Sequence, residues 1–282
     1  MPEDPGRAGG QPQDPAAREE ALRALDTRHA HSARVYDYWL GGKDYFAADR
    51  EAAEQAIAAN PGIVMDVRAN RAFLARAVRY LVADRGVRQF LDIGTGLPTA
   101  SNTHEVAQAA DPAARVVYVD NDPVVLAHAR ALLTSSVQGA TAYLDADLRD
   151  TKAILDAASE TLDFSEPVAV MLLIVLHMIP DDDDPHGIVA SLMRAVPPGS
   201  YLVLAHPASD IRTAQQAEMT RRVNERMSGS KATMRDRAAI SRFFDGLDLL
   251  DPGVVQPQQW RPEPGMAAPG QVTAWCGVAR KP

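Results

Sequence analysis

Short apolar segments alternate with stretches of helical character between residues 89 and 205, and this alternation constrains the fold more than any other feature of the sequence. Each segment has the length of a strand, and the residues between segments suffice for a helix. Strands that alternate with helices form a parallel sheet covered by helices. We therefore predict an α/β fold. The expected strands are 89–93, 114–119, 141–144, 168–174 and 200–205.

The rest of the chain divides into three parts around this pattern. Residues 1–28 are rich in Pro, Gly, Gln and acidic residues, so they bury too little apolar surface to offset the entropy of ordering, and we expect a disordered tail. Residues 29–86 contain three helical patterns and are interpreted as an N-terminal lid or extension. Residues 87–282 are assigned to the sheet domain. At its end, 254–255 and 272–278 are expected to pair as a terminal hairpin.

A glycine-rich turn follows the first expected strand, in Leu91-Asp-Ile-Gly-Thr-Gly-Leu-Pro98. Glycines there let backbone N–H groups approach a ligand with no Cβ in the way. Gly94 and Gly96 fit the first two glycines of a dinucleotide motif, but Thr99 stands where the third is required. The turn therefore favours a nucleotide-like cofactor without phosphates over NAD; an ordinary strand-to-helix turn is the alternative.

Acidic residues end the second and third expected strands. Asp120, followed by Asn121, is placed to accept hydrogen bonds from ribose hydroxyls, although Asp122 and Pro123 also suit the start of a helix. Asp147 is placed to accept from an adenine amine while Leu148 packs on the ring; a solvated acidic turn is the alternative. Open α/β sheets bind ligands at the carboxyl ends of their strands, and the elements described so far all lie there.

His177 follows the fourth expected strand, and the acidic run Asp181–Asp184 comes shortly after it. The histidine is a candidate general base for an acceptor hydroxyl or amine, although a structural role is the alternative. The four aspartates with His177 and His186 could bind a divalent metal. A solvated loop that caps the next helix explains them better, so we predict no metal.

An aromatic cluster in the N-terminal extension comprises Tyr36, Tyr38, Trp39 and Tyr45. Such a helix can fold over a cofactor pocket as a lid and form part of an acceptor site. Packing against the helices of the sheet is the alternative.

Charge and cysteine content narrow the function classes. The net charge of −8 argues against broad attraction to nucleic acid or anionic membranes. Cys276 is the only cysteine, which excludes an intramolecular disulfide and fits a reducing, cytoplasmic compartment. No apolar run reaches the length of a membrane span, so we expect no membrane association.

In order, Asp92-Ile-Gly-Thr-Gly, Asp120-Asn121, Asp147-Leu148, Val175-Leu-His177 and Pro198-Gly199 resemble the motifs of class I methyltransferases. The segments 33–45, 88–99 and 117–123 are similar to an actinobacterial family of S-adenosyl methyltransferases with no known acceptor. The resemblance covers roughly residues 30 to 280. It implies a Rossmann-like sheet of about seven strands with the last antiparallel, and S-adenosylmethionine (SAM) as cofactor. One departure is Pro98, where the general class often has a third glycine.

The predicted cofactor-binding residues are Tyr36, Asp92, Gly94, Thr95, Gly96, Asp120, Asn121, Asp147, Leu148 and Leu173. The predicted activity is methyl transfer from SAM to an unidentified acceptor, a small molecule rather than nucleic acid. His177 is the candidate catalytic residue. A non-catalytic protein that binds SAM or its demethylated product is one alternative, and an NAD-type oxidoreductase is another.

Overall fold

A computed structural model describes residues 27–99, 101–132, 135–226, 231–263 and 270–282. The tail predicted for residues 1–28 lies almost entirely outside this part of the chain. The helices of the described structure are α2 (Ser32–Leu40), α3 (Ala47–Ala59), α4 (Ile63–Arg85), α5 (Thr103–Ala110), α6 (Pro123–Leu132), α7 (Thr151–Ala158), α8 (Pro185–Ala195), α9 (Thr213–Asn224) and α10 (Arg237–Ser241).

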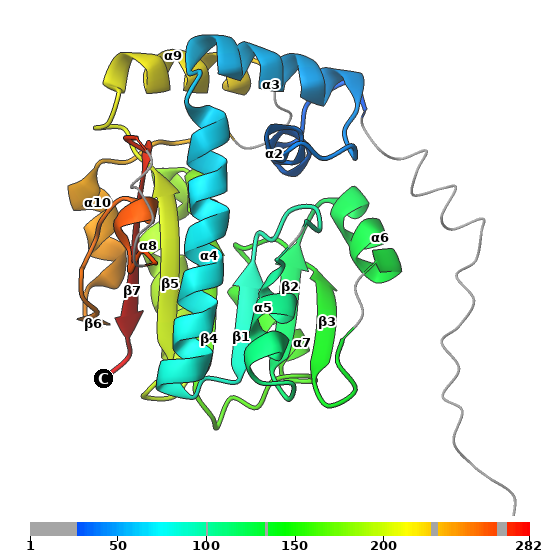
Figure 1. The fold of residues 1–282 in the computed structure, drawn as a ribbon, viewed down its shortest axis with the longest axis vertical. Coiled ribbons are helices and arrows are strands. Elements are labelled where there is room, and N and C mark those ends of the chain that lie inside the picture. The colour runs from blue at the N-terminus through cyan, green and yellow to red at the C-terminus, as the bar shows by residue number, and fades with distance from the viewer. Residues whose placement is uncertain (1–26, 100, 133–134, 227–230, 264–269) are drawn as a thin grey trace, which may run out of the picture.

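The centre of the fold is a seven-stranded sheet in the order β3-β2-β1-β4-β5-β7-β6 (Figure 1). The strands are β1 (Gln89–Ile93), β2 (Arg115–Asp120), β3 (Ala140–Asp145), β4 (Val168–Leu173), β5 (Tyr201–Pro207), β6 (Asp248–Leu249) and β7 (Ala274–Arg280). Strands β1 to β5 are parallel, and β7 runs antiparallel to both β5 and β6. The predicted α/β class, strand number and antiparallel end are confirmed.

Alternate residues of each strand face opposite layers of helices, as the two-residue period of a strand requires. In β1, Phe90 packs with α4, α5 and Trp260, whereas Leu91 and Ile93 pack with α7, α8 and α10. Both layers are continuous apolar clusters, which explains why the central strands are apolar at nearly every position. Figure 1 shows α4 and α5 on the near face of the sheet.

The terminal hairpin differs from its prediction. Strand β7 pairs mainly with β5, and on its other side it pairs with the two exposed residues of β6, while Val255 makes only an isolated bridge with Cys276. An edge strand of two residues is held by backbone hydrogen bonds and has no apolar face to bury. Its side chains therefore show no alternation of apolar and polar residues from which the strand could be predicted.

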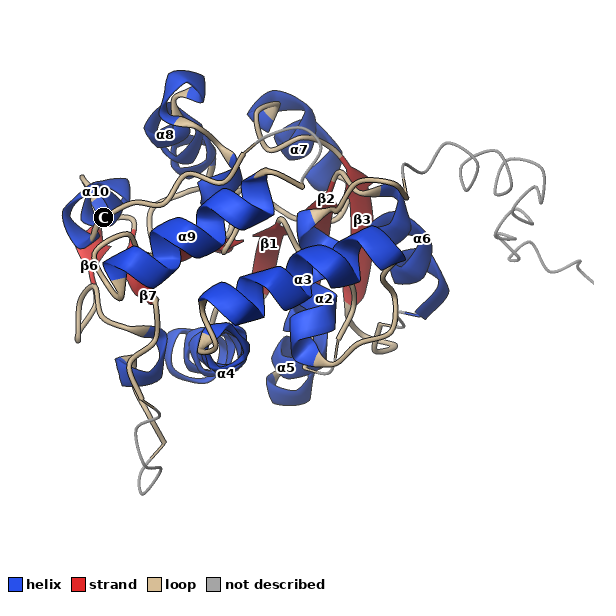
Figure 2. Cartoon of the chain, turned by 90° about the horizontal axis from the view of Figure 1, so that it is seen from above, coloured by secondary structure: helices blue, strands red, loops and turns tan. Residues whose placement is uncertain are grey.

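Helices α2, α3 and α9 lie together above the carboxyl ends of the parallel strands (Figures 1 and 2). Their contacts form one apolar cluster with the start of α4, including Ala56, Val67, Met219 and Val223. We call α2, α3 and α9 the roof. Helix α9 belongs to it although some 150 residues separate it from α3 in the sequence. Among the described residues, no helix combines the length and apolar character needed to span a membrane.

Candidate active site

A cavity of about 550 Å³ lies between the roof and the carboxyl ends of the strands. The cavity sits above β1 and β4, which are neighbours in the sheet. After β1 the chain continues toward one edge of the sheet and after β4 toward the other, and open α/β sheets bind ligands at this position. Every predicted site residue lines it: Tyr36, Asp92, Gly94, Thr95, Gly96, Asp120, Asn121, Asp147, Leu148, Leu173 and His177. Residues from distant parts of the sequence thus meet in one space.

The glycine turn after β1 requires glycine for two reasons. Gly94 and Gly96 have φ angles of 73° and 65°, a left-handed conformation that other residues adopt only with strain. A Cβ on Gly94 would stand 2.2 Å from Cγ2 of Val175, in the segment after β4. The Gly94 N–H donates to the carbonyl of Val119 (2.8 Å), which holds the turn against β2.

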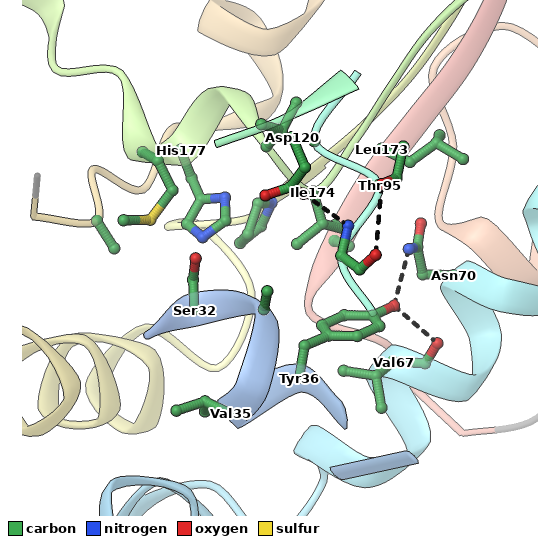
Figure 3. Close-up of a pocket in the computed structure, with 18 of the residues that line it drawn as sticks. Ser32, Val35, Tyr36, Val67, Asn70, Thr95, Asp120, Leu173, Ile174 and His177 are labelled. Carbon is green, nitrogen blue, oxygen red and sulfur yellow. Dashed lines mark hydrogen bonds between the residues drawn. The ribbon is translucent and has the colours of Figure 1, made fainter. Parts of the chain in front are cut away.

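Asp120 joins this turn to the end of β2. Its side chain is buried, and its two oxygens accept the backbone N–H groups of Gly96 (2.8 Å; Figure 3) and Asp122 (3.0 Å). Burial raises the pKa of this carboxyl, and both N–H donors oppose the rise. A carboxylate oxygen accepts more than one hydrogen bond, so this pair can also bind the two hydroxyls of a ribose.

Asp92 lies at the end of β1, where its Oδ2 accepts the hydroxyl of Thr103 at the start of α5 (2.6 Å). Burial raises the pKa of Asp92 to about 6, against the lowering effect of Thr103 and Arg71. One oxygen of Asp92 thus has a structural role, because it binds Thr103, and Asp92 also lines the cavity.

At the end of β3, Leu148 is buried and Asp147 is bound by a neighbouring arginine. Arg149 donates from its backbone N–H and its guanidinium to Asp147, and its Nε donates to Asp183 (2.7 Å). The acidic run is thus used within the fold: Asp183 binds Arg149, Asp181 binds Arg235, and Asp184 caps α8. The described residues contain no cluster suited to a metal ion.

His177 faces the cavity from the loop after β4, and its buried Nδ1 has no hydrogen-bond partner among the described residues (Figure 3). Burial lowers the pKa of His177 to about 4, and the nearby Arg235 guanidinium adds to this effect. The imidazole is therefore neutral at pH 7. A neutral imidazole with an unpartnered nitrogen can exchange a hydrogen bond or a proton with a ligand.

The loop that carries His177 is fixed by Arg235, which sequence reasoning missed. Arg235 is buried and donates to the carbonyls of Leu176 (3.0 Å) and Ile179 (2.8 Å) and to Asp181 (2.6 Å). It also lies 2.9 Å from Nε2 of His206, a buried histidine whose other nitrogen contacts the Pro207 carbonyl. Nothing in the local sequence marks Arg235, because its partners are all distant along the chain.

Two polar residues of α4, Asn70 and Arg71, also line the cavity and were not predicted. Asn70 Nδ2 donates to the hydroxyl of Tyr36 (3.0 Å), which donates in turn to the Val67 carbonyl (3.3 Å; Figure 3). The Oδ1 of Asn70 is buried and has no hydrogen-bond partner among the described residues. A signal existed: Asp66 and Asn70 interrupt the apolar stripe that continues through Phe73 and Ala77.

The roof is tied to the sheet through buried charges next to the Asp120 turn. His31 Nδ1 lies 2.8 Å from Oδ2 of Asp122, and Nε of Arg34 lies 3.6 Å from the same oxygen. Arg34 also pairs with Asp49, whose oxygens accept the backbone N–H groups of His31 and Phe46. Although burial acts to raise it, the pKa of Asp122 is lowered overall, by His31, Arg34 and the Val124 N–H.

The sheet order, the antiparallel β7 and the site at the strand ends together define a class: this is a Rossmann-like class I methyltransferase fold. The particular family follows from the sequence. A family model described as S-adenosyl methyltransferase matches residues 18–282, and the chain belongs to this family. It is a SAM-dependent methyltransferase, as the sequence predicted, and the oxidoreductase alternative is set aside.

Solved structures agree with this assignment. A DUF574-family protein from Streptomyces avermitilis shares 42% identity over 91% of this chain and 99% of its own, with a TM-score of 0.88. A candidate methyltransferase from Thermobifida fusca shares 39% identity over 91% and 96%, with a TM-score of 0.82. Magnesium protoporphyrin IX methyltransferase from Synechocystis, solved with bound SAM, is 13% identical over 97% and 100%, with a TM-score of 0.51. No curated protein sequence matches the chain.

Proposed function

We propose that this methyltransferase acts on a small-molecule acceptor bound under the roof, with His177 as general base. One observation carries the proposal. The cavity that holds the predicted cofactor residues continues past the end of β4 to His177, beneath α2 and α9. Its volume of about 550 Å³ is in the range of small-ligand sites. The net charge of −8 does not favour a nucleic-acid acceptor.

The residues at the end of each strand suit a different part of the cofactor. Asp120 and Asn121 at β2 would bind the ribose, and Leu148 with Asp147 at β3 would bind the adenine. The backbone of Gly94 to Gly96 would face the amino-acid end, together with the α4 and α2 side chains described above. Three features described above support this fit. A Cβ at Gly94 would fill the glycine turn, the buried carboxylate of Asp120 accepts hydrogen bonds, and the Oδ1 of Asn70 has no hydrogen-bond partner among the described residues.

Bound SAM supplies an electrophilic methyl group on a sulfonium. The protein's part is to hold acceptor and cofactor in line, to exclude water under the roof, and to take the acceptor's proton on His177. Ile174, next to the end of β4, has a φ of 56°, which is strained for a β-branched residue. Strain of this kind clusters at functional sites, and here it directs the chain toward His177.

We further propose that the helices of residues 29–86 that cover the cavity, together with α9, act as a lid. The lid must open to admit a ligand, and a bound ligand adds contacts to it. Saturating SAM is expected to slow backbone hydrogen exchange in α2 and α9 by about tenfold or more. Helix α7, on the far side of the sheet from α4, serves as the internal control and is expected to be unaffected. Equal exchange in α2 with and without SAM would rule out the lid.

The proposed acceptor class and base are tested with SAM carrying a labelled methyl group and a cell extract. We expect label in the small-molecule fraction, and a loss of about 100-fold or more in rate for His177→Ala with SAM affinity retained. Since the pKa of His177 is about 4, its neutral form persists as pH falls from 8 to about 5, so the wild-type rate should not drop through loss of this base until lower pH.

The alternatives give different results in this experiment. Label in protein or nucleic acid would contradict a small-molecule acceptor. Tight SAM binding with no label in any fraction would favour the non-catalytic binding protein. Full activity of His177→Ala would remove the histidine from the chemistry, and a His177→Gln variant would separate lost proton transfer from lost packing.

A further inference from the structure

The half of the cavity over β4, β5 and β7 has a distinct lining, and its chemistry restricts the acceptor. We call this half the acceptor chamber. Its apolar lining includes Trp39, Val67, Met219, Val223 and Met234. An aromatic ring and methionines offer flat, polarisable surfaces that suit an apolar ring. Trp39 lies on α2, and Met219 and Val223 lie on α9, so the roof supplies part of this wall.

Polar side chains on the far wall of the chamber are already paired. Asp66 accepts both the backbone N–H and the hydroxyl of Thr273. Gln216 accepts from Asn60 Nδ2 (3.0 Å) and donates to the Ala208 carbonyl (3.4 Å). The Arg212 guanidinium also lies 4.0 Å from Oδ1 of Asp66, so an ammonium group on the acceptor would meet a like charge beside this carboxylate, and burying an unpaired charge is costly.

Cations that line the cavity belong to its other half. Arg149 stands at the end of β3 with Asp147 and Asp183. Arg71 donates to the Ser101 carbonyl and acts on Asp92 at β1. These positions face the part of the cavity assigned to the cofactor. A carboxylate on the acceptor would thus lie in the apolar half without one of these charges beside it.

The boundary of the two halves holds Nδ1 of His177, a buried atom with no hydrogen-bond partner among the described residues. Burial opposes the protonation of this histidine, and the Arg235 guanidinium acts in the same direction. A weak base takes a proton more readily from a more acidic partner. Among uncharged hydroxyls, phenols and enols are the most acidic, whereas an aliphatic alcohol holds its proton much more tightly.

We propose that the acceptor is an uncharged, largely apolar molecule whose nucleophile is a phenolic or enolic hydroxyl, held by α2 and α9 and hydrogen-bonded to His177. This inference rests on the proposed function. The step balances as follows: the hydroxyl oxygen forms the new bond to the methyl carbon, and its proton passes to His177. The carbon–sulfur bond of the cofactor breaks with its electron pair on sulfur, which leaves the neutral demethylated product.

Four probes test the inference. They share the naphthalene ring system and differ in their single polar group: 2-naphthol, 2-naphthylmethanol, 2-naphthoate and 2-naphthylmethylammonium. Calorimetry on the full chain with saturating demethylated cofactor should show 2-naphthol binding about tenfold or more tightly than either charged probe. With SAM, 2-naphthol should be methylated at a rate about 100-fold or more above that of 2-naphthylmethanol. Tighter binding of a charged probe, no binding of 2-naphthol, or equal methylation of the two alcohols would overturn the inference.

A matched pair of variants on α9 locates the probe. Met219→Lys puts a charge into the chamber, whereas Glu218→Lys puts the same residue one position away, where the native side chain pairs with Arg221 and Arg222 and does not line the cavity. We expect Met219→Lys to weaken 2-naphthol binding by about tenfold or more and Glu218→Lys to leave it unchanged. If Met219→Lys does not fold, the wild-type probe ranking still decides. SAM binding is measured first: its absence would overturn the proposed function, while SAM binding with the opposite probe ranking would overturn this inference alone.

Discussion

Asp120→Ala is expected to weaken SAM binding by about 100-fold or more. The carboxylate is the buried acceptor at the end of β2, and hydrogen bonds to a charged group contribute about 1.5–3 kcal/mol each. Loss of two such bonds to the ribose gives about 3–6 kcal/mol, which is at least two orders of magnitude in affinity. The substitution also leaves the N–H groups of Gly96 and Asp122 without their acceptor, which loosens the turn. Isothermal titration with SAM, its demethylated product and NAD measures the effect.

The control for this substitution is Asp145→Ala. Asp145 pairs in register with Asp120 on the adjacent strand, but its side chain is exposed and does not line the cavity. Affinity for SAM should therefore be unchanged in Asp145→Ala. Asp120→Asn keeps one good acceptor and should fall between wild type and Asp120→Ala. Wild-type affinity in Asp120→Ala, or tighter binding of NAD than of SAM, would refute the assignment of this carboxylate to the ribose.

Gly94→Ala is expected to lower both stability and SAM affinity strongly. A left-handed φ of 73° costs a non-glycine residue about 1–2 kcal/mol. The added Cβ would also stand 2.2 Å from Cγ2 and 2.5 Å from Cβ of Val175, and overpacking of this kind costs about 1–3 kcal/mol. Together these effects predict a loss of about 2–5 kcal/mol in the free energy of unfolding. Because Val175 precedes His177, relief of the collision would also move the candidate base.

Gly86→Ala separates the two causes. Gly86 ends α4 with a φ of 69°, and a Cβ there would meet nothing within 4 Å. It should lose only the backbone cost, about 1–2 kcal/mol, and keep wild-type SAM affinity. Urea unfolding and calorimetric titration of both variants give the comparison. Equal losses of stability in the two variants would show that Val175 yields without cost.

The strand ends could be predicted from the sequence because each is marked by residues that lie close together in the chain. Apolar runs of strand length define β1 to β5, and the glycines and acids that follow them face the same edge in any parallel sheet. This is why residues as distant as Gly94, Asp120 and Asp147 could be placed together before the structure was known, and all line one cavity. Helix α4 was equally legible, because its apolar stripe and its terminal Gly86 are local signals.

Other parts of the site left no such signal. Helix α9 is polar overall in sequence, and nothing in it indicates that Met219 packs beside α3 and faces the cavity. Arg235 resembles any surface arginine until the fold brings the carbonyls of Leu176 and Ile179 to its guanidinium. The brief edge strand β6 was missed for the related reason that only backbone groups hold it.

The sequence by itself determined the class of fold through its periodicity, and the family resemblance of its motifs indicated the cofactor. The turn glycines and strand-end acids predicted the edge of the sheet at which a cofactor would bind, because such signals act over a few residues. The tertiary structure alone decided what covers that edge and what state His177 is in. The roof joins α2 and α3 to α9 across some 150 residues, and the pKa of His177 depends on burial and on the distant Arg235. Burial and long-range charge are properties of the packed chain, so no local pattern could carry them.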